Sequence, residues 1–190
     1  MNRRDIPNAI SFFRIFLVLP IVFLLLNKSF NLALVFFIVA GLSDALDGYL
    51  AKKYNWTSRL GSFIDPLADK LLLLSSFMVG VMVGLIPFWL LGIILMRDFI
   101  VGLGALLYHL WIEKFQGEPP FSSKLNTTLQ VGYWVVLISA QNLLTIPLSW
   151  LEFLMYSVAA TTTVSGLEYV WIWGVKAWSI AREKDRERVK

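Results

Sequence analysis

Six long apolar runs, each joined to the next by a short connection, limit most strongly how this chain can fold. About 20 consecutive apolar residues form an α-helix long enough to cross a hydrocarbon core about 30 Å thick. The composition agrees, because 57% of the 190 residues are hydrophobic and only 16% are charged, with a mean hydropathy of +0.68. Soluble domains are about half apolar and a quarter charged. The sequence therefore predicts an all-α integral membrane protein, a bundle of six transmembrane helices.

Polar or turn-forming residues separate the runs. Asn27-Lys28-Ser29 follows the first run, and Pro87 and Pro147 mark later breaks, as turn signals do. The predicted spans are residues 6–26, 30–51, 66–86, 88–112, 123–144 and 148–180. The charged tail that follows is interpreted as the solvated end of the last helix. We expect all six spans to form one domain, residues 1–190.

The positive charges are distributed unevenly between the two sides of the predicted bundle. With the N-terminus inside, the outer loops hold only Lys28. The inner side holds Arg3, Arg4, Lys52, Lys53, Arg59, Lys114, Lys124 and the basic residues of the tail. Because short cytoplasmic loops are enriched in lysine and arginine, both termini are expected in the cytoplasm of a bacterium, with the plasma (inner) membrane as the location. The alternative is the mitochondrial inner membrane.

The net charge and the cysteine count exclude other partners and sites. The formal net charge of +4 follows from the membrane topology, so no nucleic-acid partner is expected. The chain has no cysteine, which excludes disulfides and thiolate metal sites. The expected partner of the chain is the lipid bilayer, and the sequence leaves open whether the protein forms a homodimer.

Four aspartates interrupt this apolar chain at the end of the second predicted span and the start of the third. Asp44 and Asp47 are three residues apart, and Asp65 and Asp69 are four apart, so each pair shares one helix face. Two consecutive antiparallel helices would bring all four to one cavity at the cytoplasmic surface. Like charges repel strongly there, and carboxylate oxygens suit hard cations. We expect a metal site for Mg²⁺ or Mn²⁺, with two ions.

Structural ion pairing is the alternative explanation of the four aspartates. It would need several cations near them. The cations that are close in the sequence are Lys52, Lys53, Arg59 and Lys70, and long basic side chains favour the membrane interface. Because ionisable groups inside a membrane are costly, a functional site is the favoured interpretation.

A glycine inside the second predicted span has two possible explanations. Gly48 directly follows Asp47, and a glycine in a helix costs about 1 kcal/mol relative to alanine. It would permit a close approach either of a ligand or of a neighbouring helix.

The residues of this segment form the pattern D-x2-D-G-x2-A-K-x8-G-x3-D-x3-D. Its fixed positions are Asp44, Asp47, Gly48, Ala51, Lys52, Gly61, Asp65 and Asp69. This pattern resembles the signature of the CDP-alcohol phosphatidyltransferases, with Lys52 where that family usually has arginine. Lysine keeps the charge but loses the bidentate geometry toward phosphate. The segment IPNAISFFR, with Ser11 and Arg14, is similar to the first helix of the same family.

The resemblance implies an activity and roles for these residues. Such enzymes transfer the phosphatidyl group of CDP-diacylglycerol to an alcohol and release CMP. The resemblance implies that Asp69 is both a metal ligand and the general base. The other implied metal ligands are Asp44, Asp47 and Asp65, and the implied nucleotide-binding residues are Gly48, Ala51, Lys52 and Gly61.

Polar residues in the fourth and fifth predicted spans are candidates for binding the alcohol acceptor: Arg97, Lys124, Asn126 and Thr127. An internal ion pair between Arg97 and Asp98 that bridges helices is the other interpretation. The R-D pair and the pattern S-K-x-N-T-x-x-Q resemble the cardiolipin synthases of this family, whose acceptor is phosphatidylglycerol. Phosphatidylglycerophosphate synthases, whose acceptor is glycerol 3-phosphate, are the alternative branch.

Two other functional classes also use clustered carboxylates. A divalent-cation transporter would have a pathway lined by acidic residues, but the other half of this bundle offers no acidic partner. Membrane prenyltransferases use aspartates with Mg²⁺, but they usually have more helices and two well-separated motifs. The sequence therefore favours the phosphatidyltransferase.

Overall fold

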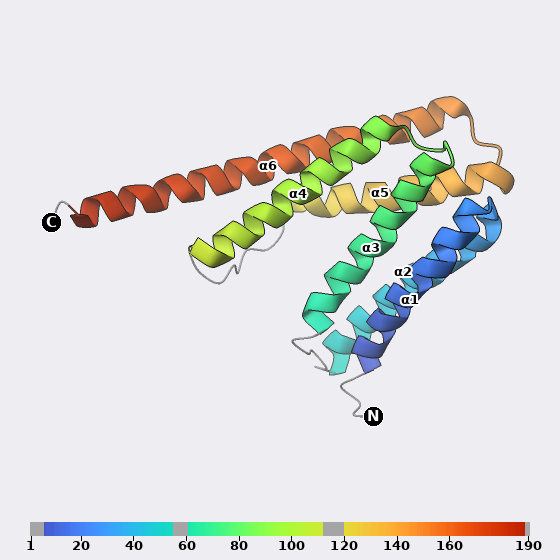
Figure 1. Ribbon diagram of the computed structural model, residues 1–190, viewed down its shortest axis with the longest axis horizontal. Coiled ribbons are helices and arrows are strands. Elements are labelled where there is room, and N and C mark those ends of the chain that lie inside the picture. Colours follow the sequence, from blue (N-terminus) through green and yellow to red (C-terminus); the bar gives the residue numbers. More distant parts are fainter. Residues whose placement is uncertain (1–5, 55–60, 112–119, 189–190) are drawn as a thin grey trace. The chain divides into compact units, whose positions relative to one another are not determined.

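The computed structural model describes residues 6–54, 61–111 and 120–188, and in these ranges it contains six α-helices and no β-strand (Figure 1). The helices are α1 (Ile6–Leu26), α2 (Phe30–Tyr54), α3 (Gly61–Met82), α4 (Phe88–Trp111), α5 (Phe121–Asn142) and α6 (Leu148–Arg188). The prediction of an all-α chain with six helices is confirmed. No helix in the described ranges is both long enough and apolar enough to cross a membrane.

Most predicted helix boundaries are close to those observed, and α3 differs most. It begins at Gly61, five residues before the predicted start, and continues through Pro66. Proline lacks an N–H group and its ring crowds the carbonyl four residues earlier, yet α3 has already begun at Gly61 and continues through it. As a result Asp65 lies inside the helix, on the same face as Asp69.

The ends of α1 and α3 both use left-handed backbone. After α1, Lys28 has a φ of 56°, and the Ser29 N–H donates to the Leu24 carbonyl at 2.9 Å. After α3, Gly84 has a φ of 81°, a conformation that glycine adopts without strain. This turn ends α3 four residues before the predicted boundary. The last helix, α6, continues through the charged tail to Arg188, as expected.

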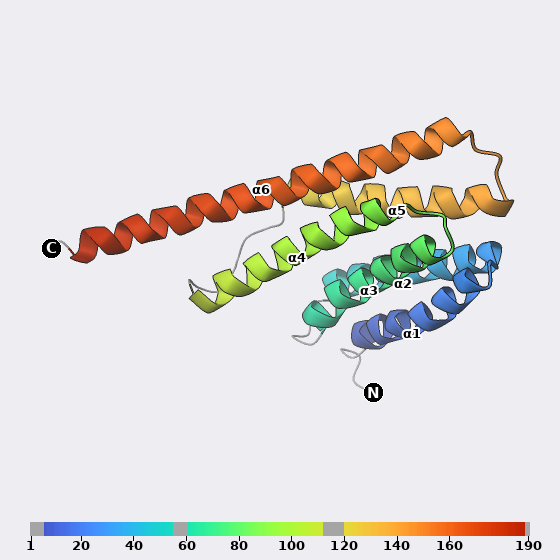
Figure 2. The same ribbon diagram turned by 45° about the horizontal axis from the view of Figure 1, so that its top comes forward.

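The chain divides into two compact units, and the first consists of residues 1–87 and 134–147. Here α1 packs against both α2 and α3, as two views of the ribbon show (Figure 1, Figure 2). The buried side chains of α1 recur every three or four residues, from Ser11 to Leu25, which places them on one helix face. The core is formed by Leu17, Ile21, Leu25, Ala33, Phe37, Ala40, Ala68, Leu72, Phe77, Trp134 and Ile138.

Gly80 of α3 makes room for the largest ring in this core. The rings of Phe77 and Trp134 stack with centroids 5.4 Å apart, and a Cβ at Gly80 would lie 2.8 Å from Cζ3 of Trp134 and from Cδ1 of Ile86. We expect Gly80→Ala to lower the free energy of unfolding by about 1–3 kcal/mol, as overpacking does. Denaturant unfolding checks this, with Gly41→Ala as the matched control, since a Cβ there meets nothing within 4 Å. Equal stability of the two variants would contradict the packing described.

The second unit consists of residues 88–133 and 148–190, and in it α4 packs against α6. Its interior is unusually polar. Arg97, Asn126, Gln130, Thr162 and Ser165 are all buried. Buried polar groups normally form hydrogen bonds, so the helices of this unit are joined by polar contacts.

Candidate active site

The first polar cluster of the protein is built around a buried arginine on α1. Nη1 of Arg14 lies 2.9 Å from Oδ1 of Asp44 and 2.5 Å from Oδ1 of Asp69. The Arg14 side chain is fully buried, whereas the two aspartate side chains are 45% and 48% exposed. Because one nitrogen contacts both carboxylates, α1 holds an acidic side chain of α2 beside one of α3.

A second contact joins α1 to α3 in the same place. The buried Ser11 hydroxyl donates a hydrogen bond to Oδ1 of Asp65. Ser11 and Arg14 are three residues apart on α1, and their partners are four apart on α3, so both pairs lie along facing sides of the helices. We call Ser11, Arg14, Asp44, Asp65 and Asp69 the Arg14 cluster.

The Arg14 cluster corrects the expectation about ion pairing. The expected cations are close to the aspartates in the chain, whereas Arg14 lies 55 residues from Asp69. One positive charge in an otherwise apolar run was the available signal, because such a charge needs a partner in a membrane. Part of the negative charge is therefore neutralised by the protein itself.

The predicted four-carboxylate metal site is only partly visible. Within the described side chains, no group of three or more histidines, cysteines or acidic residues is arranged to hold a metal ion. The side chain of Asp47 lies outside the described residues. The oxygen donors of Asp44, Asp65 and Asp69 are nevertheless the type that Mg²⁺ or Mn²⁺ prefers, and the side chains of Asp44 and Asp69 are about half exposed.

A Cβ at Gly48 would meet nothing within 4 Å in the described part of the chain, so no described helix packs tightly against this position. The explanation by ligand approach stays a prediction. Ala51 and Lys52 lie on α2, and Gly61 begins α3, but the side chains of Ala51 and Lys52 and the surroundings of Gly61 are outside the described residues.

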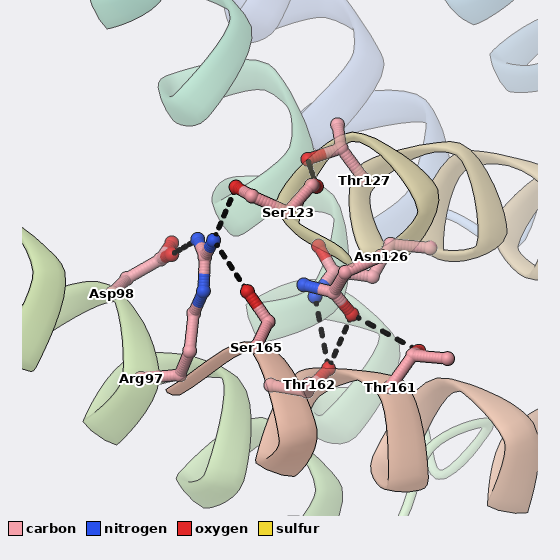
Figure 3. A network of polar contacts seen from close by, with 9 residues as sticks. Arg97, Asp98, Ser123, Asn126, Thr127, Thr161, Thr162 and Ser165 are labelled. Atoms are coloured by element: carbon pink, nitrogen blue, oxygen red, sulfur yellow. Dashed lines mark hydrogen bonds and ion pairs between the residues drawn. The ribbon is translucent and has the colours of Figure 1, made fainter. Parts of the chain in front are cut away.

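A second polar cluster lies in the other unit, around Arg97 of α4 (Figure 3). Nη1 of Arg97 lies 2.7 Å from Oδ1 of Asp98, and Nη2 donates to the hydroxyls of Ser123 at 2.6 Å and Ser165 at 3.1 Å. The alternative interpretation, an ion pair that bridges helices, is therefore met only in part: Arg97 pairs with Asp98 within α4, and the contacts that bridge helices come from the two serines. We call Arg97, Asp98, Ser123 and Ser165 the Arg97 cluster.

The remaining acceptor candidates on α5 divide into buried and exposed residues. Asn126 is buried, and its Oδ1 accepts hydrogen bonds from the hydroxyls of Thr161 at 3.2 Å and Thr162 at 2.7 Å (Figure 3). Lys124 and Thr127 are exposed, and the Thr127 hydroxyl donates to the Ser123 carbonyl at 3.2 Å. The oxygen of Asn126 is thus used to join α5 to α6.

Glu168 of α6 faces α5. Its Oε2 accepts a hydrogen bond from the Ser122 hydroxyl. Serines such as Ser122, Ser123 and Ser165 carry no sequence signal that separates a bridging hydroxyl from an ordinary one, so they were not predicted.

Comparison with known proteins assigns the chain to a family. The family model for CDP-alcohol phosphatidyltransferase matches residues 4–167. The chain belongs to the CDP-alcohol phosphatidyltransferase family. The match contains both the Arg14 cluster and the Arg97 cluster.

Named relatives within the family fall into two groups. A probable cardiolipin synthase (CMP-forming) of Drosophila melanogaster is 32% identical over 187 residues, which cover 89% of this chain and 58% of that protein. A cardiolipin synthase (CMP-forming) of Homo sapiens is 32% identical over 185 residues, which cover 88% of this chain and 61% of that protein. The CDP-diacylglycerol–glycerol-3-phosphate 3-phosphatidyltransferase of Bacillus subtilis (strain 168) is 30% identical over 189 residues, covering 87% and 93%. The chain thus spans only about three-fifths of the two animal proteins.

Proposed function

We propose that this chain transfers the phosphatidyl group of CDP-diacylglycerol to an alcohol hydroxyl and releases CMP. The observation that carries the proposal is the Arg14 cluster, in which acidic residues of the family motif on α2 and α3 meet at Arg14 Nη1. Because Asp44 and Asp69 are about half exposed, a substrate can reach their carboxylates from outside.

Asp44, Asp47, Asp65 and Asp69 would hold a pair of Mg²⁺ or Mn²⁺ ions. When bound, these ions supply charge stabilisation for an in-line displacement at phosphorus. Arg14 holds Asp44 and Asp69 at a fixed distance before any ligand arrives. The hydrogen bond from the Ser11 hydroxyl likewise fixes the position of the Asp65 carboxylate.

Asp69 is proposed as the general base. Its carboxylate takes the proton of the acceptor hydroxyl while the acceptor oxygen forms a bond to the β-phosphorus of CDP-diacylglycerol, the one that carries the diacylglycerol. The bond from this phosphorus to the bridging oxygen breaks, and its electron pair leaves with CMP. General-base assistance of this kind contributes about 10²–10⁴-fold to a rate.

Gly48, Ala51, Lys52 and Gly61 are proposed to border the nucleotide. If Gly48 serves ligand approach, Gly48→Ala should stabilise α2 by up to about 1 kcal/mol, because alanine is the better helix former. The same substitution should lower CMP release. Gly41 lies on the same helix, and a Cβ there also meets nothing within 4 Å. Gly41→Ala should therefore stabilise α2 as much as Gly48→Ala does, and it should leave turnover unchanged. Unaltered turnover in Gly48→Ala would contradict the nucleotide role.

The Arg97 cluster, with Lys124, Asn126 and Thr127, is proposed to bind the acceptor. Arg97 already shares its charge with Asp98 at 2.7 Å, so it complements a singly charged phosphodiester better than a phosphate monoester with nearly two charges. This favours phosphatidylglycerol. The relationship to the Bacillus subtilis enzyme keeps glycerol 3-phosphate as the second candidate.

The protein is proposed to lie in a lipid bilayer, with both termini cytoplasmic. The support is a row of large apolar side chains that point outward from α1, namely Phe12, Phe16, Leu19 and Phe23. Contiguous exposed apolar surface of this kind is rare on soluble monomers. The bacterial plasma membrane is the proposed location, and the mitochondrial inner membrane is the alternative.

An assay with separate acceptors tests the proposed function. The purified full chain is supplied with CDP-diacylglycerol and Mg²⁺ or Mn²⁺, and CMP is followed with phosphatidylglycerol or with glycerol 3-phosphate. We expect CMP release with phosphatidylglycerol. Release with glycerol 3-phosphate alone would show that the acceptor is glycerol 3-phosphate and not phosphatidylglycerol. Uptake of Mn²⁺ into vesicles without any CMP release would instead favour a cation transporter.

A further inference from the structure

A groove in the second unit lies between α4 and α6, beside the Arg97 cluster. Its volume is about 290 Å³, close to the lower limit for small-molecule sites. Side chains spaced three or four residues apart form its two walls, so each wall is one helix face. The walls are formed by Ile93, Met96 and Ile100 of α4 and by Gly166, Leu167 and Val170 of α6. Met96 and Leu167 are exposed, so the groove is open to the surroundings.

The floor of the groove is formed where Gly166 meets the stem of Arg97. A Cβ at Gly166 would lie 3.4 Å from Cγ of Arg97, which is an ordinary contact distance. The glycine is therefore not required for helix contact, and its absent side chain leaves the groove deeper. Nε of Arg97 is buried and has no hydrogen-bond partner among the described residues, so an unused donor lies next to an apolar groove.

The apolar lining of the groove and the unused donor of Arg97 indicate which kind of molecule would bind there. Water needs two or more polar partners to occupy a cavity, and apart from Arg97, Thr162 and Thr163 the side chains that line the groove are apolar. In a bilayer an alkyl chain fills such a groove without loss, because lipid tails are as apolar as leucine. The Arg97 guanidinium favours an anion, and it forms strong hydrogen bonds with phosphate oxygens. One molecule that has both parts is an anionic phospholipid.

We infer that the groove between α4 and α6 binds one acyl chain of the acceptor, with the phosphodiester of the same lipid beside Arg97. This inference rests on the proposed function and specifies its acceptor as a membrane lipid. A soluble phosphate monoester could contact Arg97 but would leave the groove empty.

Photolabelling tests the groove without requiring turnover. The full chain is reconstituted with phosphatidylglycerol that carries a diazirine in one acyl chain, and labelled peptides are identified by mass spectrometry. We expect label in both walls, residues 93–100 and 162–170. Phosphatidylcholine with the same diazirine should label these walls less, and added glycerol 3-phosphate should not displace the label. Label spread evenly over outward-facing residues such as Phe16 and Phe23 would overturn the inference.

Blocking variants give the second part of the test. Gly166→Leu and the rim variant Leu167→Trp should reduce wall labelling about tenfold or more, since one misfitting methylene in an apolar pocket costs about that much. Gly92→Leu is the matched control on α4, because a Cβ there meets nothing within 4 Å. Labelling that is unchanged in the folded rim variant would overturn the groove site.

CMP release by the unmutated chain separates the two failures. Normal release with phosphatidylglycerol but no wall labelling would refute the groove while the proposed function stands. Wall labelling without CMP release from any alcohol would refute the proposed function while the lipid site stands.

Discussion

Asp69→Asn is expected to lower CMP release by about 10²–10⁴-fold, the usual contribution of a general base. Asparagine has nearly the same shape, and its carbonyl oxygen can still accept a hydrogen bond from Arg14, but an amide cannot take a proton from the acceptor. CDP-diacylglycerol binding should be largely retained, since Asp44, Asp47 and Asp65 are unchanged. The measurements are initial rates of CMP release and binding of a radiolabelled CDP-diacylglycerol.

The matched control for this variant is Glu152→Gln. It makes the same change from acid to amide at an exposed position of α6 and should leave the rate unchanged. Wild-type turnover by Asp69→Asn would show that Asp69 is not the base.

Arg14→Met is expected to have the largest effect on stability. It removes the buried cation and leaves Asp44 and Asp69 facing each other. Breaking a fully buried ion pair costs about 3–5 kcal/mol, and the half-exposed carboxylates reduce this to about 2 kcal/mol, because solvent screens charges at exposed positions. Divalent cations should recover part of the loss, since they would bind the same carboxylates without competing with Arg14. A bound ion stabilises the folded state by mass action.

Thermal unfolding in EDTA and in Mg²⁺ measures this difference. The Tm of Arg14→Met should rise more on addition of Mg²⁺ than the Tm of the wild type. Arg97→Met is the matched control, because Arg97 is also buried and paired with an aspartate but belongs to the other cluster. It should lose stability without gaining from Mg²⁺. An equal response to Mg²⁺ in both variants would contradict metal binding at the Arg14 cluster.

Helices were the part of the fold that the sequence predicted best. Long apolar runs between turn signals define a helix almost independently of its neighbours, so α1, for example, has the predicted bounds. The predicted start of α3 is wrong because proline favours the first turn of a helix, which points to a start at Pro66, whereas α3 begins at Gly61 and continues through this proline. Boundaries of this kind depend on local backbone energies that the apolar pattern does not contain.

The acidic half of the Arg14 cluster was predictable because its members lie close together in the chain. Its cation was not, because Arg14 reaches Asp69 across 55 residues, and only packing of α1 on α3 brings them together. The same holds for Ser123 and Ser165 around Arg97, since a serine is common at helix contacts whether or not it bridges. Short-range spacing therefore identified the acids, and long-range packing identified their partners.

Metal-dependent transfer at the Arg14 cluster is measured most directly with the full chain, CDP-diacylglycerol and phosphatidylglycerol. The protein is treated with EDTA, and Mg²⁺ or Mn²⁺ is then restored while CMP and the lipid product are quantified. We predict equal amounts of CMP and cardiolipin with the metal, neither product in EDTA, and neither product from Asp44→Asn under any condition. CMP release that persists in EDTA or in Asp44→Asn, or no release from folded protein with any alcohol, would contradict the proposed mechanism.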